Sequence, residues 1–258
     1  MERRRAILLA LLVTFLWSTS WVLIKLGLRQ SLPPLTFAGL RYMLAFLCLL
    51  PLVIFNREQR ARLKQLGRGD WAWLVGLGLV YYAVTQGTQY LSLDTLPAAL
   101  VSLMLNLTPV VVAAGGLIFL GERPSKTQWL GLLVTMAGVV IYFQMGAVLS
   151  GMWLGMGAAV LCLVANATSA VMGRRVNRGG RIPVLLVTLI SMGVGASVLL
   201  VVGGATQGFG AMSWQHWLII AWLAVVNTAL AFTLWNASLR VLSAVESSIL
   251  NGLMLPQI

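Results

Sequence analysis

The chain has 258 residues, of which 59% are hydrophobic and only 9% are charged, and its mean hydropathy is +0.91. A soluble domain carries about a quarter of charged residues, so this composition indicates a membrane protein. The net charge of +12 could suggest a nucleic-acid partner, but the placement of the basic residues between apolar segments excludes that class.

Apolar segments follow one another along the chain, each long enough for a bilayer core, which takes about 20 helical residues. Strand-like alternation of apolar and polar residues is absent, so we expect an all-α membrane protein built as a polytopic helical bundle. In chain order the expected spans are Ala6–Leu28, Leu35–Phe55, Trp71–Leu91, Leu96–Leu120, Trp129–Phe143, Met152–Gly173, Pro183–Val202, Trp217–Leu239 and Ser243 to the end of the chain.

The loops between these spans indicate the topology. Numbered alternately from a cytoplasmic N-terminus, the inside loops carry 15 of the 18 basic residues, leaving Lys25, Arg29 and Arg41. Because basic residues gather on the cytoplasmic side of membrane proteins, we expect a cytoplasmic N-terminus. The inside residues are Arg3, Arg4, Arg5, Arg57, Arg60, Arg62, Lys64, Arg68, Arg123, Lys126, Arg174, Arg175, Arg178, Arg181 and Arg240.

Two halves of the chain echo each other. The stretch YLSLDTLPAALVSLMLNLTP, Tyr90–Pro109, matches NASLRVLSAVESSILNGLMLP, Asn236–Pro256, at an offset of 146 residues at its start and 147 at the proline. The same offset lays Phe15–Lys25 on Cys162–Met172. A unit of five spans is odd, so two copies insert in opposite senses, as in many secondary transporters. We therefore expect one repeat over residues 1–146 and a second, incomplete repeat over residues 147–258.

Five landmarks in order resemble those of the EamA family of the drug/metabolite transporter superfamily. They are WSTSWVLIK, PPLTFAGLRYMLAF, QYLSLDTLPAALVSLMLNLTPVVVA, LGERPSKTQWLGLLVTMAGVVI and AVVNTALAFTLWNASLRVLSAVESSILNGLMLP, and together they cover essentially the whole chain. The resemblance implies ten helices in two inverted five-helix repeats that move amino acids, other small metabolites or drugs, usually outward. Nine spans are present, so we expect the tenth to be missing and a protein ending at Ile258 to be unstable or inactive.

Prolines interrupt two corresponding spans. Pro109 lies inside the fourth span and Pro256 at the related place in the ninth, where each removes a backbone donor and loosens the helix. Paired interruptions indicate a transport site, and a harmless kink is the alternative. We expect the stretch Gly121-Glu122-Arg123-Pro124, after the fourth span, to form a cytoplasmic turn and no active site.

Polar and aromatic side chains inside the spans are the candidates for substrate contact, because lipid-facing positions are expected to be aliphatic. The alternative for each of them is a hydrogen bond that only joins neighbouring helices. The candidates are Trp17, Ser18, Trp21, Tyr82, Gln86, Ser102, Asn106, Asn166, Asn227, Trp235 and Asn251, with Gln89, Ser169 and Ser248 beside them.

Charged residues inside spans are costly and need a role. We expect Lys25 to reach the outer interface and Arg41 to tie helices together through backbone carbonyls rather than to touch substrate. Glu246 is the only acidic residue clearly within a span, near the cytoplasmic end of the ninth. Burial there would favour its protonated form, which makes it the best available site for proton coupling. The alternatives are a solvated carboxylate or an ion pair with a base such as Arg240.

The preferred function is a secondary transporter, an exporter that works by alternating access. The alternative is a membrane protein that does not transport solutes, such as a scramblase or a structural subunit. No His-Glu-x-x-His, Gly-x-Ser-x-Gly or Walker motif occurs, so we expect no enzyme activity, catalytic residue, metal or cofactor. The expected partners are a small-molecule substrate and the lipid bilayer. Gly151 and Gly155 could serve a homodimer, although packing within the chain is favoured.

Overall fold

The computed structural model of the chain describes residues 2–30, 32–122, 125–144 and 152–254. In these ranges the chain forms α-helices, segments of π-helix and connecting turns, and no strand. In chain order the elements are α1 (Arg3–Arg29), α2 (Pro34–Ile54), α3 (Arg57–Lys64), α4 (Arg68–Leu77), η1 (Gly78–Thr85), α5 (Gln86–Thr95), α6 (Ala98–Leu105), α7 (Thr108–Gly115), η2 (Gly116–Leu120), α8 (Lys126–Gln144), α9 (Trp153–Asn177), α10 (Val184–Gln207), α11 (Trp214–Ala224), η3 (Val225–Leu230), α12 (Ala231–Ser238) and α13 (Ala244–Gly252).

Within the described ranges, six helical runs are long and apolar enough to cross a membrane: α1, α2, α6 to η2, α9, α10 and α11 to α12. The all-α membrane architecture expected from the sequence is therefore confirmed. The expected third span forms one run from α4 through η1 to α5, while α8 and α13 lie at the expected fifth and ninth spans. The total of nine spans and their inverted repeat stay predictions.

The polar segment after α2 forms a short helix that the sequence did not predict. No residue of α3 is buried, and its N-cap, Asn56, accepts hydrogen bonds from Glu58 N at 3.0 Å and Gln59 N at 3.2 Å. Asparagine at this position satisfies amide groups that have no partner in the first turn of a helix. Hydropathy, the signal used to find spans, does not detect an exposed helix of this kind.

Helices α2 and α10 pack closely because glycines lie between them. A Cβ atom on Gly39 would lie 2.7 Å from Leu200 Cα, and one on Gly203 would lie 2.5 Å from Thr36 N. Larger residues at these positions would push the two helices apart. The close packing holds α2 in the bundle, and α2 carries Arg41 to the cavity described below.

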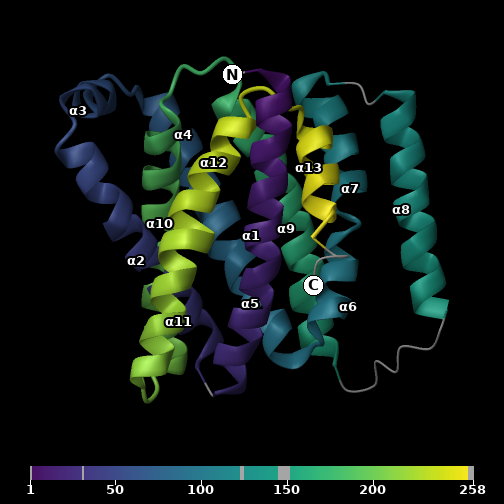
Figure 1. Cartoon of the computed structure of the whole chain (residues 1–258), viewed down its shortest axis with the longest axis horizontal. Helices are drawn as coiled ribbons and strands as arrows, with labels where there is room; N and C mark the ends of the chain where they lie inside the picture. The colour runs from purple at the N-terminus through teal and green to yellow at the C-terminus, as the bar shows by residue number, and fades with distance from the viewer. Residues whose placement is uncertain (1, 31, 123–124, 145–151, 255–258) are drawn as a thin grey trace.

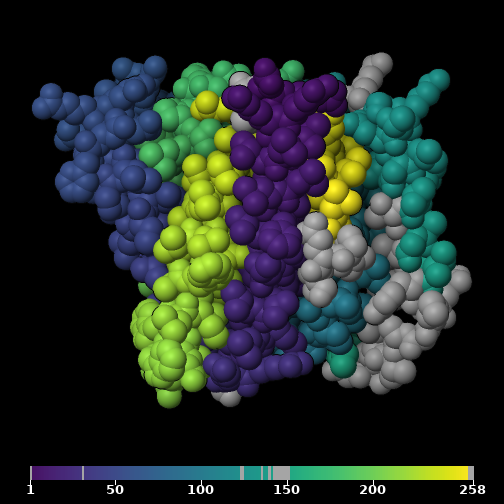
Figure 2. Space-filling view, viewed as in Figure 1, coloured from purple at the N-terminus to yellow at the C-terminus, as the bar shows by residue number. Residues whose placement is uncertain are grey.

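The helices stand side by side, with α3 at one edge of the bundle and α8 at the other (Figure 1). Helix α1 is exposed along its length on the face seen in Figure 2, between α11 and α12 on one side and α13 on the other. The end of the bundle that holds the N-terminus is called the N-terminal end here. The ion pairs of the described residues join segments at this end, which we expect to face the cytoplasm because it carries the basic loops. They are Arg3–Glu246, Arg174–Glu122 and Arg181–Asp70.

Candidate functional site: a polar cavity inside the bundle

The expected fourth span is interrupted between α6 and α7. In an unbroken helix, Pro109 would clash with the carbonyl group of Leu105 and leave it without a donor. Helix α6 instead ends at Leu105 and α7 begins at Thr108, so Pro109 lies in a first turn, where no amide donor is needed. Asn106 N closes the end of α6 by donating to Ser102 O at 3.0 Å. Pro256, the expected counterpart, lies outside the described residues.

Helix α13 ends against this interruption. Its last residue, Gly252, has no side chain, and a Cβ atom there would lie 2.8 Å from Asn106 Oδ1. Leu105 and Gly252, the last residues of α6 and α13, are 147 positions apart, which is the offset of the sequence repeat. Two short helices that correspond in the sequence therefore end beside each other.

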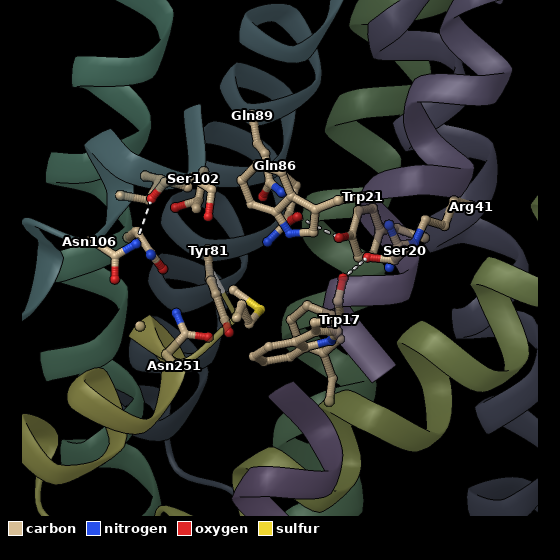
Figure 3. A pocket seen from close by; sticks show the side chains of 17 residues that line it. Trp17, Ser20, Trp21, Arg41, Tyr81, Gln86, Gln89, Ser102, Asn106 and Asn251 are labelled. Atoms are coloured by element: carbon tan, nitrogen blue, oxygen red, sulfur yellow. Dashed lines mark hydrogen bonds between the residues drawn. The ribbon is translucent and has the colours of Figure 1, made fainter. Parts of the chain in front are cut away.

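A cavity of about 50 Å³, the central cavity, lies where these helix ends face α1, α2 and η1 (Figure 3). One part of its wall is aromatic and the other carries amide and hydroxyl groups, together with one guanidinium. The residues of the wall are Trp17, Ser20, Trp21, Arg41, Tyr42, Tyr81, Thr85, Gln86, Gln89, Ser102, Leu105, Asn106, Asn166, Phe232, Asn251, Gly252 and Met254.

A second cavity of about 20 Å³, the inner cavity, shares Tyr81, Asn166 and Asn251 with the central one. Its wall includes three buried oxygen atoms that have no hydrogen-bond partner in the described part of the chain: Thr108 Oγ1, Ser248 Oγ and Asn251 Oδ1. Buried polar atoms in proteins ordinarily have a partner. These three oxygen atoms are therefore available to a molecule that enters the cavity.

Most of the predicted contact residues meet at the two cavities, and their role in binding stays a prediction. Those on the wall of the central cavity are Trp17, Trp21, Gln86, Gln89, Ser102, Asn106, Asn166 and Asn251. Those on the wall of the inner cavity are Asn166, Ser169, Trp235, Ser248 and Asn251.

Ser18 and Asn227 do not line either cavity, although both were predicted to contact substrate. Ser18 Oγ donates to Phe15 O of its own helix at 2.7 Å. The side chain of Asn227 donates to Leu16 O and, at 3.0 Å, to Thr19 Oγ1. Asn227 thus joins η3 to α1, which is the helix-joining role that was the alternative for each candidate.

The π-helical segment η1 explains why Tyr81 rather than the predicted Tyr82 borders the cavities. A π-helix has more residues per turn than an α-helix, so side chains change face relative to an α-helical projection. Tyr81 borders both cavities, whereas the ring of Tyr82 packs 5.0 Å from Phe232 and 5.7 Å from Tyr42. No sequence pattern marked Tyr42 or Phe232 as wall residues, because aromatic residues also face lipid.

Arg41 is 2% exposed and borders the central cavity. It donates from Nε to Thr228 Oγ1 at 2.6 Å, from Nη1 to the Tyr90 hydroxyl at 3.1 Å and from Nη2 to Asn227 O at 3.2 Å. These bonds join α2 to α5 and η3. Arg41 therefore ties helices together as expected, but through two hydroxyl groups and only one carbonyl, and it also reaches the cavity.

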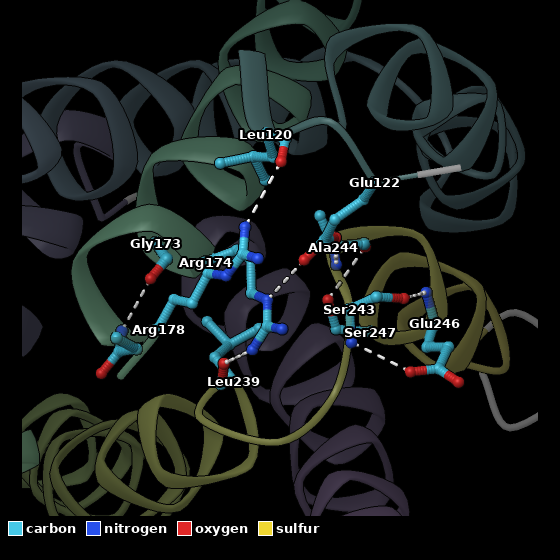
Figure 4. A network of polar contacts seen from close by, with 11 residues as sticks. Leu120, Glu122, Gly173, Arg174, Arg178, Leu239, Ser243, Ala244, Glu246 and Ser247 are labelled. Carbon is cyan, nitrogen blue, oxygen red and sulfur yellow. Dashed lines mark hydrogen bonds and ion pairs between the residues drawn. The ribbon is translucent and has the colours of Figure 1, made fainter. Parts of the chain in front are cut away.

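A polar cluster joins Glu122, after η2, to α9 and to the start of α13 (Figure 4). Glu122 accepts hydrogen bonds from Arg174 Nε at 2.8 Å and from Ala244 N at 2.9 Å, and Arg174 Nη1 donates to Leu239 O at 2.7 Å. These four residues form the Glu122–Arg174 cluster, which adjoins the cavity because Gly173 and Leu239 belong to its wall. Glu122 was expected only in a turn, and the sequence could not predict its partners across the bundle.

A similar contact occurs at the opposite end of the bundle. Lys25 Nζ donates to Leu93 O and, at 3.0 Å, to Leu96 O. Leu93 and Leu239, whose carbonyls accept from Lys25 and Arg174, are 146 positions apart, the offset at the start of the sequence repeat. Lys25 thus holds the end of α5 as Arg174 holds the end of α12, rather than only reaching the interface as expected.

Glu246 lies outside the walls of both cavities. Its carboxylate accepts from Ser243 N at 2.9 Å and pairs with Arg3 at 2.6 Å, while Ser243 Oγ accepts from Glu246 N at 3.2 Å. This is a reciprocal cap at the start of α13 plus an ion pair, and both favour the charged carboxylate. The partner is Arg3 rather than Arg240, and proton coupling through Glu246 stays a prediction.

The sequence and the fold are similar to those of known proteins. The EamA-like transporter family matches residues 4–144 and 153–255. The uncharacterized transporter YvbV of Bacillus subtilis is 31% identical over 217 residues, which are 83% of this chain and 67% of that protein. A probable amino-acid metabolite efflux pump of Salmonella typhimurium is 26% identical over 243 residues, 90% of this chain and 77% of that protein. A solved crystal structure shares the fold, with a TM-score of 0.79 and 20% identity over 99% of this chain and 86% of that chain.

Proposed function

Because the chain belongs to the EamA-like transporter family, we propose that it is a secondary transporter that exports small metabolites, amino acids or drugs by alternating access. The chain is a multi-pass membrane protein and a transporter rather than an enzyme. The direction of transport, which is export, and the substrate class are our proposals. The efflux pump of Salmonella typhimurium, similar over most of both chains, supports them.

The central cavity is the observation that carries the proposal. Amide, hydroxyl and guanidinium groups face it inside a bundle whose exposed helix surfaces carry many large apolar side chains. Polar groups inside a membrane are costly unless they face the interior of a bundle or a water-filled path. An interrupted helix that ends at such a place is typical of transporter substrate sites, and α6, which is interrupted before α7, ends there beside Gly252 of α13.

The size of the cavity supports alternating access. Sites that hold a small ligand usually enclose about 300 Å³ or more, while the central cavity has about 50 Å³. The central cavity must therefore widen to hold substrate, and we propose that the described form is closed. The Glu122–Arg174 cluster and the contacts of Lys25 lie at opposite ends of the bundle. We propose that these two sets of contacts break in turn, so that the cavity opens first at one end and then at the other.

The π-helical segments support the proposed repeat. The first residues of η1 and η3, Gly78 and Val225, are 147 positions apart, which is the offset of the sequence match. A π-helical segment is uncommon and often lies at a functional site. Its presence at matching places of two spans favours two copies of one unit, one over residues 1–146 and the other over residues 147–258.

Reconstitution tests the proposal. We expect proteoliposomes to take up at least one compound of a radiolabelled panel of amino acids, nucleosides and cationic drugs faster than empty liposomes do. Asn166→Trp, which fills a position on the wall of both cavities, should abolish this flux. Val164→Trp is the matched control, because Val164 lies on the same helix with 48% of its surface exposed. Equal flux in Asn166→Trp and the control, or no flux above empty liposomes, would contradict the proposal.

A further inference from the structure

The central cavity contains a positive charge that has no negative partner among the residues that the structure describes. The three acceptors of the Arg41 guanidinium, Thr228 Oγ1, the Tyr90 hydroxyl and Asn227 O, are all neutral. The chain has six acidic residues, all of them within the described ranges, and none belongs to the wall of either cavity. Within the described ranges, the charge of Arg41 is therefore balanced by dipoles alone.

The hydrogen bonds of Arg41 leave part of the guanidinium free. A guanidinium has five N–H groups, and the described bonds use one on Nε, one on Nη1 and one on Nη2. One of the two that remain lies on Nη1 and the other on Nη2, and a carboxylate can accept hydrogen bonds from both of these nitrogen atoms. A buried charge without a counter-ion is costly. An anion that enters the cavity can therefore pair with the positive charge of Arg41 and accept hydrogen bonds from its remaining N–H groups.

The opposite part of the wall has the complementary chemistry. Asn251 lies across the cavity from Arg41, with the rings of Trp17 and Tyr81 between them in the view of Figure 3. Asn251 Oδ1 and Ser248 Oγ, on the same helix, have no hydrogen-bond partner among the described residues, and Ser248 borders the adjoining inner cavity. Oxygen atoms without donors suit an amino or amide N–H group of a bound molecule.

We propose that the substrate is a small carboxylic acid that also carries an N–H donor, and that Arg41 selects it by pairing with the carboxylate. This inference rests on the proposed transport function and narrows its substrate class. The carboxylate lies at Arg41, the N–H donor lies toward Asn251, and the aromatic wall contacts the apolar part of the molecule. The positive charge of Arg41 excludes cations that lack a carboxylate from the central cavity.

The unaltered protein provides the first test, because it does not depend on whether a variant folds. Thermal unfolding in detergent is measured with each of the twenty L-amino acids and, at equal concentration, with the matching carboxamide. We expect at least one acid to stabilise the protein and its carboxamide, which lacks the negative charge, to bind at least about tenfold more weakly. Carboxamides that bind as well as the acids overturn the inference, and so does a panel in which no acid binds.

Variants of Arg41 then test whether this residue causes the preference for acids over carboxamides. Arg41→Gln removes the charge and should abolish the preference for acid over carboxamide, while Arg41→Lys keeps the charge, loses the bidentate pair and should retain a reduced preference. Arg240→Gln is the matched control, because Arg240 Nη2 also donates to a carbonyl, Ile182 O at 2.9 Å, outside both cavity walls. If Arg41→Gln does not fold, the inference is tested by Arg41→Lys and by the comparison of each acid with its carboxamide in the unaltered protein. An undiminished preference in Arg41→Lys overturns the role of Arg41.

The failure of this inference differs from the failure of the proposed function. Flux that is confined to cationic or uncharged compounds leaves a transporter and overturns the carboxylate site. Binding of acids over carboxamides without any flux in proteoliposomes leaves the carboxylate site and overturns transport.

Discussion

Replacing Glu122 by glutamine tests whether the Glu122–Arg174 cluster holds the N-terminal end of the bundle closed. The Glu122 carboxylate accepts from Arg174 at 2.8 Å and from Ala244 N at 2.9 Å, and the two side chains of the pair are 15% and 12% exposed. Exposed ion pairs stabilise by about 0–1 kcal/mol, whereas breaking a fully buried pair costs about 3–5 kcal/mol. Glutamine keeps the shape and one acceptor, so we expect the closed form to lose about 2 kcal/mol, between these limits.

A loss of about 2 kcal/mol corresponds to a roughly thirtyfold shift toward the form that is open at this end. A cysteine at position 173, on the wall of the inner cavity, reports that opening. It is placed in a background that lacks Cys48 and Cys162 and is labelled with an impermeant maleimide from the cytoplasmic side of inside-out vesicles. We expect Glu122→Gln to raise the labelling rate at position 173 by about this factor.

Asp70→Asn is the matched control for this experiment. It breaks the ion pair between Asp70 and Arg181, which lies at the same end of the bundle but outside the walls of both cavities. The reasoning is refuted if Glu122→Gln leaves the labelling rate unchanged or raises it no more than Asp70→Asn does.

Three further predictions concern packing, topology and proton coupling. Gly203→Ala places a Cβ atom 2.5 Å from a backbone nitrogen of α2 and should lower the free energy of unfolding by about 1–3 kcal/mol, whereas Gly138→Ala, in open space, should not lower the Tm. A cysteine at position 60 should react with impermeant reagents only from the cytoplasm and one at position 94 only from outside; labelling of position 60 on intact cells contradicts the topology. If Glu246 carries a coupled proton, Glu246→Gln abolishes the acceleration of flux by a pH gradient and leaves substrate exchange intact. Flux that keeps the wild-type dependence on the gradient removes Glu246 from the coupling.

The sequence predicted those features that depend on local chemistry. Hydropathy located the membrane helices, because a bilayer core requires about 20 apolar residues whatever they pack against. Pro109 indicated an interruption, because a proline ring cannot be accommodated in an unbroken helix without losing a hydrogen bond. Polar residues at helical spacing, such as Ser102 and Asn106, lie on the wall of the central cavity.

Features that depend on exact helical register or on distant partners could not be predicted. The π-helical segment η1 places Tyr81 rather than Tyr82 at the cavities, and no residue pattern in the stretch distinguishes a π-helix from an α-helix. Asn227 is occupied by acceptors on α1, and Glu122 by donors on α9 and at the start of α13. Such pairs join residues far apart in the chain and become visible only when the helices are assembled.

Exchange across a reconstituted membrane tests the central claim most directly. We expect the return of the empty transporter to limit the cycle of alternating access, so that substrate on the far side accelerates the uptake of labelled substrate. We therefore expect proteoliposomes preloaded with an unlabelled amino acid that binds the protein to take up the labelled form faster than proteoliposomes loaded with buffer. Uptake that is equal with and without preloading, or that equals the uptake of empty liposomes, would contradict alternating access through the central cavity.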